Sequence, residues 1–163
     1  SARIIHGVKI EILNPQTGQR TEATGRRSEN SVNDDCLVLR ISYGKRSILM
    51  PADISQRVER LLVEQGANLR SDVLLVPHHG GASSSSSPFL QAVQPAVAAV
   101  SCGRLNRVRL PHPLVLERFS AHPCFLLRTD RDGAVMVSTD GSFLRCRTVG
   151  KNRQGPFDEF LLQ

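Results

Sequence analysis

The sequence predicts a layered α/β sandwich with a mixed sheet, and three observations support this fold class. Strand-like apolar segments alternate with helix-like segments through the middle of the chain. Two central segments, 73–76 and 96–101, are almost continuously apolar, which is typical of parallel strands covered on both faces. Hairpin patterns nearer the two ends add antiparallel strands, so the sheet is expected to be mixed.

The first predicted strand covers 8–13, where apolar and polar residues alternate up to an Asn-Pro pair. A polar stretch at 16–34 is expected to be a long loop. A hairpin follows, because two apolar segments at 36–43 and 46–50 flank a turn that contains Gly44. These segments predict the antiparallel part of the sheet.

Three helices are expected in the rest of the chain. Val58 and Leu62 belong to an apolar stripe with helical spacing that ends near Gly66, and Pro88 and Pro113 each stand at a position that suits the first turn of a helix. The closing strands are expected at 124–128, 134–138 and 142–147, with Asp-Gly turns at 132–133 and 140–141.

Length, composition and charge limit the class of protein. The 163 residues suit one compact domain, 1–163, with 1–7 and 151–163 as tails. Aromatic residues make up 4% with no Trp, which argues against base stacking on exposed aromatics, and we expect a soluble piece without a membrane helix or signal peptide. The net charge of +6 favours an anionic partner such as nucleic acid, although a merely basic surface has the same composition. The four cysteines form no C-x-x-C pair, so a structural zinc site is not supported and the redox compartment stays open.

A carboxylate and two imidazoles follow neighbouring predicted strands. Asp53 comes after 46–50, and His78 and His79 come after 73–76. Because sites of α/β proteins lie at the carboxyl ends of strands, these side chains can share one divalent cation, which lowers the pKa of bound water toward ~7. Two plainer interpretations stay open: Asp53 caps the following helix, or the His-His-Gly segment is only a polar strand end.

Three further motifs carry polar chemistry. The serine run 83–87 is either a flexible linker or, with the glycines before it, a set of donors to phosphate. Arg104, Arg107 and Arg109 lie close together with almost no acid among them, which suits phosphate binding. His112 stands between two prolines at a helix start, where a histidine is more often structural than catalytic.

Five stretches resemble one family in order and spacing, and the Pro-His-His-Gly element is the most specific of them. The stretches are 33–40, 48–53, 72–81, 101–113 and 128–133. Together they look like the metallo-β-lactamase-like domain of ComEC-type competence proteins, which take DNA into bacteria. The resemblance implies an αββα sandwich, of which this chain is mostly the C-terminal half. It also implies a metal-dependent nuclease, with Zn or Mn as its metal, on the outer side of the cytoplasmic membrane and attached to a membrane channel domain.

The resemblance assigns roles to the candidate residues. Asp53 matches the bridging carboxylate, His78 or His79 the last histidine ligand, and His112 the second histidine of a His-Pro-His element. Asp53, His79 and His112 are therefore expected to be catalytic. In the whole protein, the arginines at 104, 107 and 109 are expected to hold the phosphates of DNA. The superfamily motif H-x-H-x-D-H is absent from this chain. The upstream half of the domain is therefore expected to supply the other ligands, and the fragment alone to bind metal weakly and to hydrolyse nothing efficiently.

Three departures from the family pattern suggest a second hypothesis, a degenerate DNA-binding module without catalysis. Ala52, Gly81 and Leu110 stand where the family has Gly, Ser and His. A hydrolase of another phosphodiester is a third hypothesis. The half-sandwich also predicts a partner for one buried face, either the upstream half or a second copy of the chain.

Overall fold

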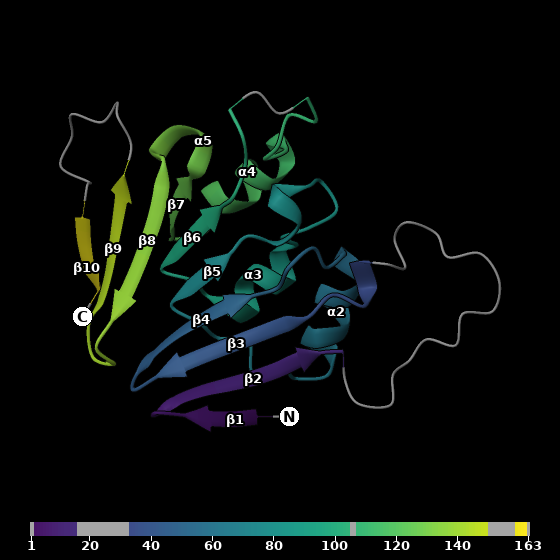
Figure 1. Ribbon diagram of the computed structural model, residues 1–163. Coiled ribbons are helices and arrows are strands. Elements are labelled where there is room, and N and C mark those ends of the chain that lie inside the picture. The colour runs from purple at the N-terminus through teal and green to yellow at the C-terminus, as the bar shows by residue number, and fades with distance from the viewer. Residues whose placement is uncertain (1, 16–32, 105–106, 150–158, 163) are drawn as a thin grey trace.

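The computed structural model describes residues 2–15, 33–104, 107–149 and 159–162 (Figure 1). Seven strands form one sheet in the order of the chain, β1-β2-β3-β4-β5-β6-β7. Their bounds are Ala2–Ile5, Val8–Asn14, Val38–Tyr43, Arg46–Met50, Val73–Leu75, Val97–Val100 and Phe125–Arg128. The strands β1 to β4 pair antiparallel and β4 to β7 pair parallel. The mixed sheet with flanking helices confirms the predicted fold class.

Helices pack against one face of this sheet and alternate along the chain with its parallel strands. They are α2 (Gln56–Glu64), η1 (Pro77–Gly80), α3 (Ser87–Val93) and α4 (Pro113–Ser120). The one-turn helix α5 (Thr129–Asp132) instead follows directly after β7, the last strand of the sheet. Leu62 of α2, Phe89 of α3 and Val115 of α4 are buried together with Leu49 and Leu74 of the sheet. This larger core lies between helices and strands, and its apolar side chains supply most of the buried hydrophobic surface.

A second, antiparallel sheet of three strands packs on the opposite face. Its strands are β8 (Ala134–Thr139), β9 (Leu144–Val149) and β10 (Glu159–Leu162), in the order β10-β9-β8. Leu144 and Cys146 of β9 are buried against Val73, Val97 and Leu127 of the main sheet. The intervening β9 residues are exposed, which is the alternation of a strand with one buried face. The described layers are therefore helices, sheet and sheet.

The predicted elements agree with the structure except near the ends and in one turn. Residues 2–5 and 159–162, which the sequence analysis leaves as tails, form β1 and β10 by pairing with neighbouring strands. The expected turn at 132–133 is the end of the one-turn helix α5. The predicted loop 16–34 lies outside the described residues except for its last two positions. No helix among the described residues is long and apolar enough to cross a membrane.

The face of β2, β3 and β4 opposite the helices is apolar but only partly covered. Cross-strand pairing aligns Ile12 with Leu39 and Leu39 with Met50, and Ile41 with Ile48, so these side chains share one face. Ile12 and Met50 are more than a third exposed. None of these five side chains is fully buried by the described part of the chain, so the face has room for a further layer.

Candidate functional site

The side chains of Asp53 and His79 meet at one edge of the main sheet. Asp53 follows β4 and His79 follows β5, and because these two strands are parallel neighbours, their carboxyl ends lie at the same edge. The distance from Asp53 Oδ1 to His79 Nε2 is 3.8 Å, and the two side chains are 46% and 51% exposed. The structure thus brings together the carboxylate and an imidazole that the sequence analysis placed at neighbouring strand ends.

The helix-cap interpretation of Asp53 is wrong. The helix α2 begins at Gln56 with Ser55 as its N-cap residue. The Ser55 hydroxyl donates a hydrogen bond of 2.6 Å to the Asp34 carboxylate, so Asp34 orients the residue that precedes the helix. Asp53 stands two residues before that cap, where its carboxylate is free to face His79.

A backbone hydrogen bond determines which nitrogen of His79 faces Asp53. His79 Nδ1 lies 2.8 Å from the carbonyl oxygen of Ser101. A carbonyl oxygen only accepts, so Nδ1 carries the proton and donates it, and the neutral ring has its lone pair on Nε2. Metal-binding histidines usually donate their other ring N–H to a carbonyl or carboxylate oxygen in this way, which fixes the orientation of the ring.

The Asp53–His79 pair fits a divalent metal but does not complete a site. Two ligand bonds of about 2.0–2.2 Å can bridge a gap of up to ~4 Å, so one ion can touch both side chains at their separation of 3.8 Å. Among the described residues there is no group of three or more His, Cys, Asp or Glu side chains that could hold a metal. A catalytic zinc site normally takes three protein ligands, which is one more than this pair provides.

His78 occupies a different environment from His79. Its ring is half-buried, its Nδ1 is buried without a hydrogen-bond partner, and its backbone N–H donates to the Ala52 carbonyl oxygen over 3.1 Å. The imidazole that lies beside the Asp53 carboxylate is that of His79, the second histidine of the Pro-His-His-Gly motif.

Three of the seven non-glycine residues with positive φ among the described residues lie at or beside this pair. Ala52, His78 and His79 have φ values of 53°, 51° and 52°, in the left-handed region that residues with a Cβ rarely adopt. Ala52 stands where the resembling family has glycine, the residue that suits this conformation. Such strain persists where the surrounding structure holds it, and functional sites are where it gathers.

Gly80 allows the histidine segment to pack against the loop before α4. Gly80 has φ +78°, and a Cβ there would lie 2.6 Å from the Pro111 side chain. The Gly80 carbonyl accepts a 2.8 Å hydrogen bond from the His112 backbone N–H. The His112 ring caps α4 by accepting from the Leu114 N–H over 3.3 Å, so it has a structural role, while its catalytic role stays a prediction.

Gly80→Ala is expected to lower the free energy of unfolding by about 2–4 kcal/mol, because it adds both left-handed strain and a clash with Pro111. Gly66→Ala is the matched control: Gly66 has φ +63°, but nothing lies within 4 Å of the added Cβ, so about 1 kcal/mol is expected. Urea unfolding of both variants measures the difference. Equal losses would show that the contact with Pro111 is unimportant.

The serine run after the histidines is a packed loop, which rules out the flexible-linker interpretation. Ser84, Ser85 and Ser86 are buried, and the Ser84 hydroxyl contacts the carbonyl oxygens of Pro77 and Gly81, each at 2.9 Å. The Ser84 hydroxyl therefore faces the protein, whereas Ser83 and Ser87, at the two ends of the run, are exposed. The suggested role as phosphate donors stays a prediction.

Glu59 holds this loop and was missed by the sequence analysis. Its side chain is fully buried on α2, and its carboxylate accepts hydrogen bonds from the backbone N–H groups of Ser85 and Ser86. Burial raises the pKa of the Glu59 carboxyl, and the two backbone donors partly oppose that effect. The available signal was its spacing: Glu59 lies three residues before Leu62, on the buried stripe of the helix.

A small pocket of about 280 Å³ adjoins His79. Its lining comes from His79, Ser101, Cys102, Gly103 and Leu110. The Cys102 thiol lies 3.1 Å from the Asp130 carboxylate, and burial raises its pKa, with the hydrogen bond to Asp130 as a further cause. The thiol therefore stays protonated at neutral pH, which makes it a poor nucleophile in this pocket.

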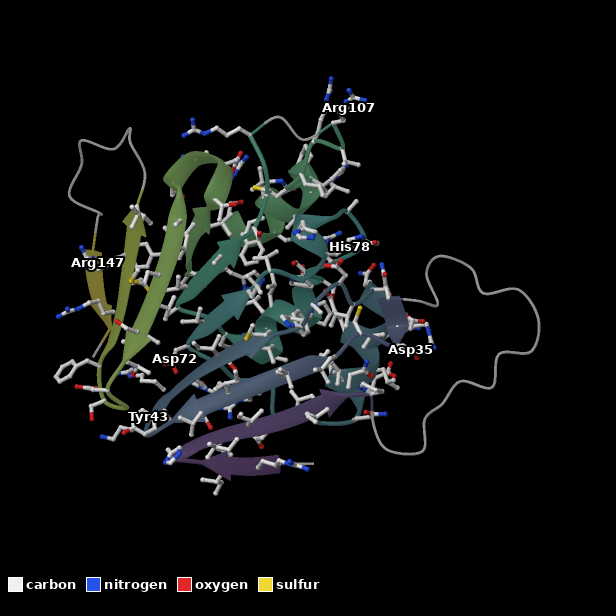
Figure 2. All side chains as sticks on the ribbon, viewed as in Figure 1. Asp35, Tyr43, Asp72, His78, Arg107 and Arg147 are labelled. Atoms are coloured by element: carbon white, nitrogen blue, oxygen red, sulfur yellow. The ribbon has the colours of Figure 1, made fainter. Side chains whose placement is uncertain are left out.

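The three predicted phosphate-binding arginines lie on the connection between β6 and α4. Arg104 Nε donates a 3.0 Å hydrogen bond to the carbonyl oxygen of Asp130. Arg107 and Arg109 are exposed, and Figure 2 shows Arg107 pointing away from the body of the molecule. Residues 105 and 106 lie outside the described residues. Exposed guanidinium groups can bind phosphates, so this role stays a prediction.

Comparison with known proteins finds bacterial relatives of this chain, including proteins named for competence. The chain is 35% identical over 130 residues to ComE operon protein 3 of Bacillus subtilis, a match over 80% of this chain and 15% of that protein. It is 38% identical over 130 residues to competence protein ComA of Neisseria gonorrhoeae, over 79% and 18%. It is 32% identical over 132 residues to recombination protein 2 of Haemophilus influenzae, over 81% and 15%. No protein-family model matches the chain.

These relatives support a competence-protein family for the chain. The chain spans less than one fifth of the length of each of the three. The activity and partners of the whole protein are therefore a matter for proposal.

Proposed function

We propose that this chain is part of a metallo-β-lactamase-like domain of a competence protein that takes part in DNA uptake. In this proposal the complete domain hydrolyses DNA phosphodiesters during transformation. The observation that carries the proposal is the contact of Asp53 with His79 at 3.8 Å, with His79 oriented through Ser101. The competence relatives and the net charge of +6 support DNA as the substrate.

Each of the two side chains has a distinct part in the proposed site. The Asp53 carboxylate supplies an anionic oxygen ligand, and His79 supplies its unprotonated Nε2, which the hydrogen bond to Ser101 holds in place. The two side chains would hold Zn or Mn, which would lower the pKa of a bound water and so make a nucleophile available. The exposed Arg107 and Arg109 attract the DNA backbone toward this edge of the sheet.

The upstream half of the same domain is the proposed partner of the apolar face on β2, β3 and β4. That face has partly exposed isoleucine, leucine and methionine side chains, and the relatives are more than five times longer than the matched segment. The upstream half would supply both the missing layer and the missing metal ligands. In this arrangement the domain is attached to a membrane channel domain and lies on the outer side of the cytoplasmic membrane.

Metal removal tests the hydrolytic part of the proposal. The longer protein, which joins this chain to its upstream sequence, is expected to cleave single-stranded DNA with Mn²⁺ or Zn²⁺ and to stop when EDTA removes the metal. The 163-residue chain alone is expected to show little cleavage under the same conditions, because it lacks ligands. Gel analysis of a labelled oligonucleotide measures both reactions, and cleavage that persists in EDTA would contradict the proposal.

A DNA-binding module without catalysis is the second candidate. The observation that favours it is that the described residues bring only two candidate metal ligands together, Asp53 and His79. This alternative predicts DNA binding that needs no metal and weakens steeply with salt, in a longer protein that cleaves nothing. The same oligonucleotide, followed by anisotropy in EDTA, separates the two candidates.

Sedimentation analysis tests the proposed partner of the apolar face on β2, β3 and β4. A dimer of the 163-residue chain would favour a second copy of the chain on that face instead of the upstream half.

A further inference from the structure

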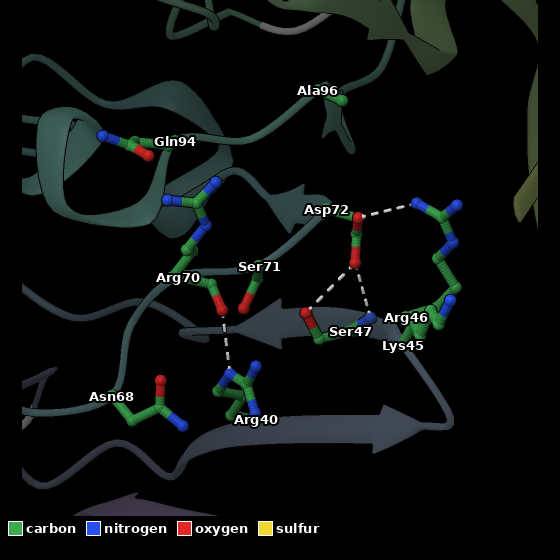
Figure 3. Close-up of a pocket in the computed structure, with 10 residues that line it drawn as sticks. All are labelled: Arg40, Lys45, Arg46, Ser47, Asn68, Arg70, Ser71, Asp72, Gln94 and Ala96. Carbon is green, nitrogen blue, oxygen red and sulfur yellow. Dashed lines mark hydrogen bonds and ion pairs between the residues drawn. The ribbon is translucent and has the colours of Figure 1, made fainter. Parts of the chain in front are cut away.

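A basic pocket of about 530 Å³ opens on the molecule away from the candidate metal site (Figure 3). Three connections form it: the β3–β4 hairpin, the segment between α2 and β5, and the segment between α3 and β6. Four of its lining side chains are cationic and one is a carboxylate. The charged residues are Arg40, Lys45, Arg46, Arg70 and Asp72.

The pocket and the candidate metal site lie at opposite ends of the same strands. Arg46 begins β4 and Asp72 precedes β5, whereas Asp53 and His79 follow these strands. Figure 2 shows Asp72 and His78 toward the two ends of the sheet. The two places therefore cannot act on the same phosphate group.

Two of the four cations are already neutralised. Arg46 pairs with the Asp72 carboxylate at 3.2 Å, and the other oxygen of that carboxylate accepts from the Ser47 N–H and hydroxyl. Arg40 pairs with Glu11 at 2.9 Å and donates to the Arg70 carbonyl oxygen. These contacts engage the carboxylates of Asp72 and Glu11 and hold the walls of the pocket in place.

Lys45 and Arg70 are the remaining cations, and both are exposed. In the part of the chain that the structure describes, no hydrogen bond or ion pair is recorded for either side chain. The backbone of Lys45 is positioned nevertheless, because its N–H donates a 2.7 Å hydrogen bond to the Gly141 carbonyl oxygen. The side-chain amides of Asn68 and Gln94 also line the pocket and can donate to an anion.

We infer that this pocket is a second nucleic-acid contact, which binds backbone phosphates through Lys45 and Arg70. A lysine acts as a point charge and an arginine as a planar fork, and both suit phosphate oxygens. The identification of the polyanion as DNA rests on the proposed function. A contact at the far end of the sheet would hold a strand that extends beyond the cleavage site.

The test is single-stranded DNA binding by the 163-residue chain in EDTA, measured by anisotropy of a labelled thymidine oligonucleotide across a salt series. The double variant Lys45→Gln/Arg70→Gln is compared with the control Arg3→Gln/Arg60→Gln, which removes the same charge from exposed positions outside the pocket. Loss of two phosphate contacts should reduce the slope of log K against log salt by about 1.4. This corresponds to about 25-fold weaker binding at 0.1 M salt. The control should weaken binding less than about threefold.

Two results would overturn the inference. Equal weakening by the two double variants would mean that only net charge matters. Absence of binding by the parent chain would remove the contact altogether. Because binding is measured in EDTA, its failure leaves the cleavage test at Asp53 unaffected, and a failed cleavage test leaves this comparison standing.

Discussion

Asp53→Asn in the longer protein is expected to lower metal-dependent cleavage of single-stranded DNA by at least about a hundredfold. Loss of a residue that hydrogen-bonds to a metal ligand typically costs about 10–100-fold in metal affinity or activity. In the proposed site Asp53 would itself be a ligand, and Asn would replace its anionic oxygen with a neutral one, so a larger loss is expected. Initial rates of oligonucleotide cleavage at saturating Mn²⁺ measure the effect. Calorimetric titration with Mn²⁺ should show weaker metal binding by the same variant.

Asp35→Asn is the matched control for this experiment. Asp35 is exposed near the start of β3 and makes the same charge change without facing a histidine, so its rate should stay within about twofold of the parent. Asp53 is nearly half exposed, so Asp53→Asn should not change the unfolding midpoint. Unchanged cleavage in a folded Asp53→Asn variant would remove this carboxylate from the mechanism.

Glu59→Ala is expected to destabilise the chain by about 2–4 kcal/mol, because it leaves the N–H groups of Ser85 and Ser86 buried without acceptors. Urea unfolding at neutral pH measures the loss. The control is Glu64→Ala, which removes an exposed carboxylate from the same helix. Glu64 makes only an exposed ion pair with Arg60 at 3.9 Å, so the free energy of unfolding should change by less than about 0.5 kcal/mol. A Glu59→Ala loss no larger than that of the control would show that the loop does not depend on this carboxylate.

The raised pKa of Glu59 gives a second measurement. The protonated carboxyl is favoured by folding, so its contribution to stability is fully present below the unfolded pKa of about 4.5 and is lost as pH rises through the raised value. Glu59→Gln cannot ionise. The parent chain should therefore lose stability relative to Glu59→Gln as pH rises above 4.5, and a constant difference would contradict the assignment.

Local patterns were sufficient for most of the central elements. These patterns depend only on residues that are neighbours in the sequence: the alternation at 8–13, the turn at Gly44, and the apolar stretches at 73–76 and 96–101. The structure has β2, the β3–β4 hairpin, β5 and β6 at these places. The strand β1 was not predicted, because it is a strand only through its pairing with β2, and its side chains are exposed. Such a segment lacks the burial that produces a readable pattern.

The sequence was sufficient to predict that Asp53 and the histidines lie at neighbouring strand ends, but not which histidine faces Asp53. The order of the chain placed Asp53 and the two histidines at the carboxyl ends of adjacent strands. The preference for His79 over His78 depends on left-handed backbone angles and on the carbonyl of Ser101, which lies 22 residues away in the chain. Local sequence does not encode either feature.

The sequence by itself determined the α/β class, the basic character and the pairing of a carboxylate with an imidazole, because periodicity, charge and strand order are properties of the chain. Only the tertiary structure decided that Glu59 holds the serine loop and that Lys45 and Arg70 share a pocket. The reason is that burial and charge balance depend on groups that are distant in sequence. A serine run or a lysine in a turn has the same local pattern whether water or a buried carboxylate surrounds it.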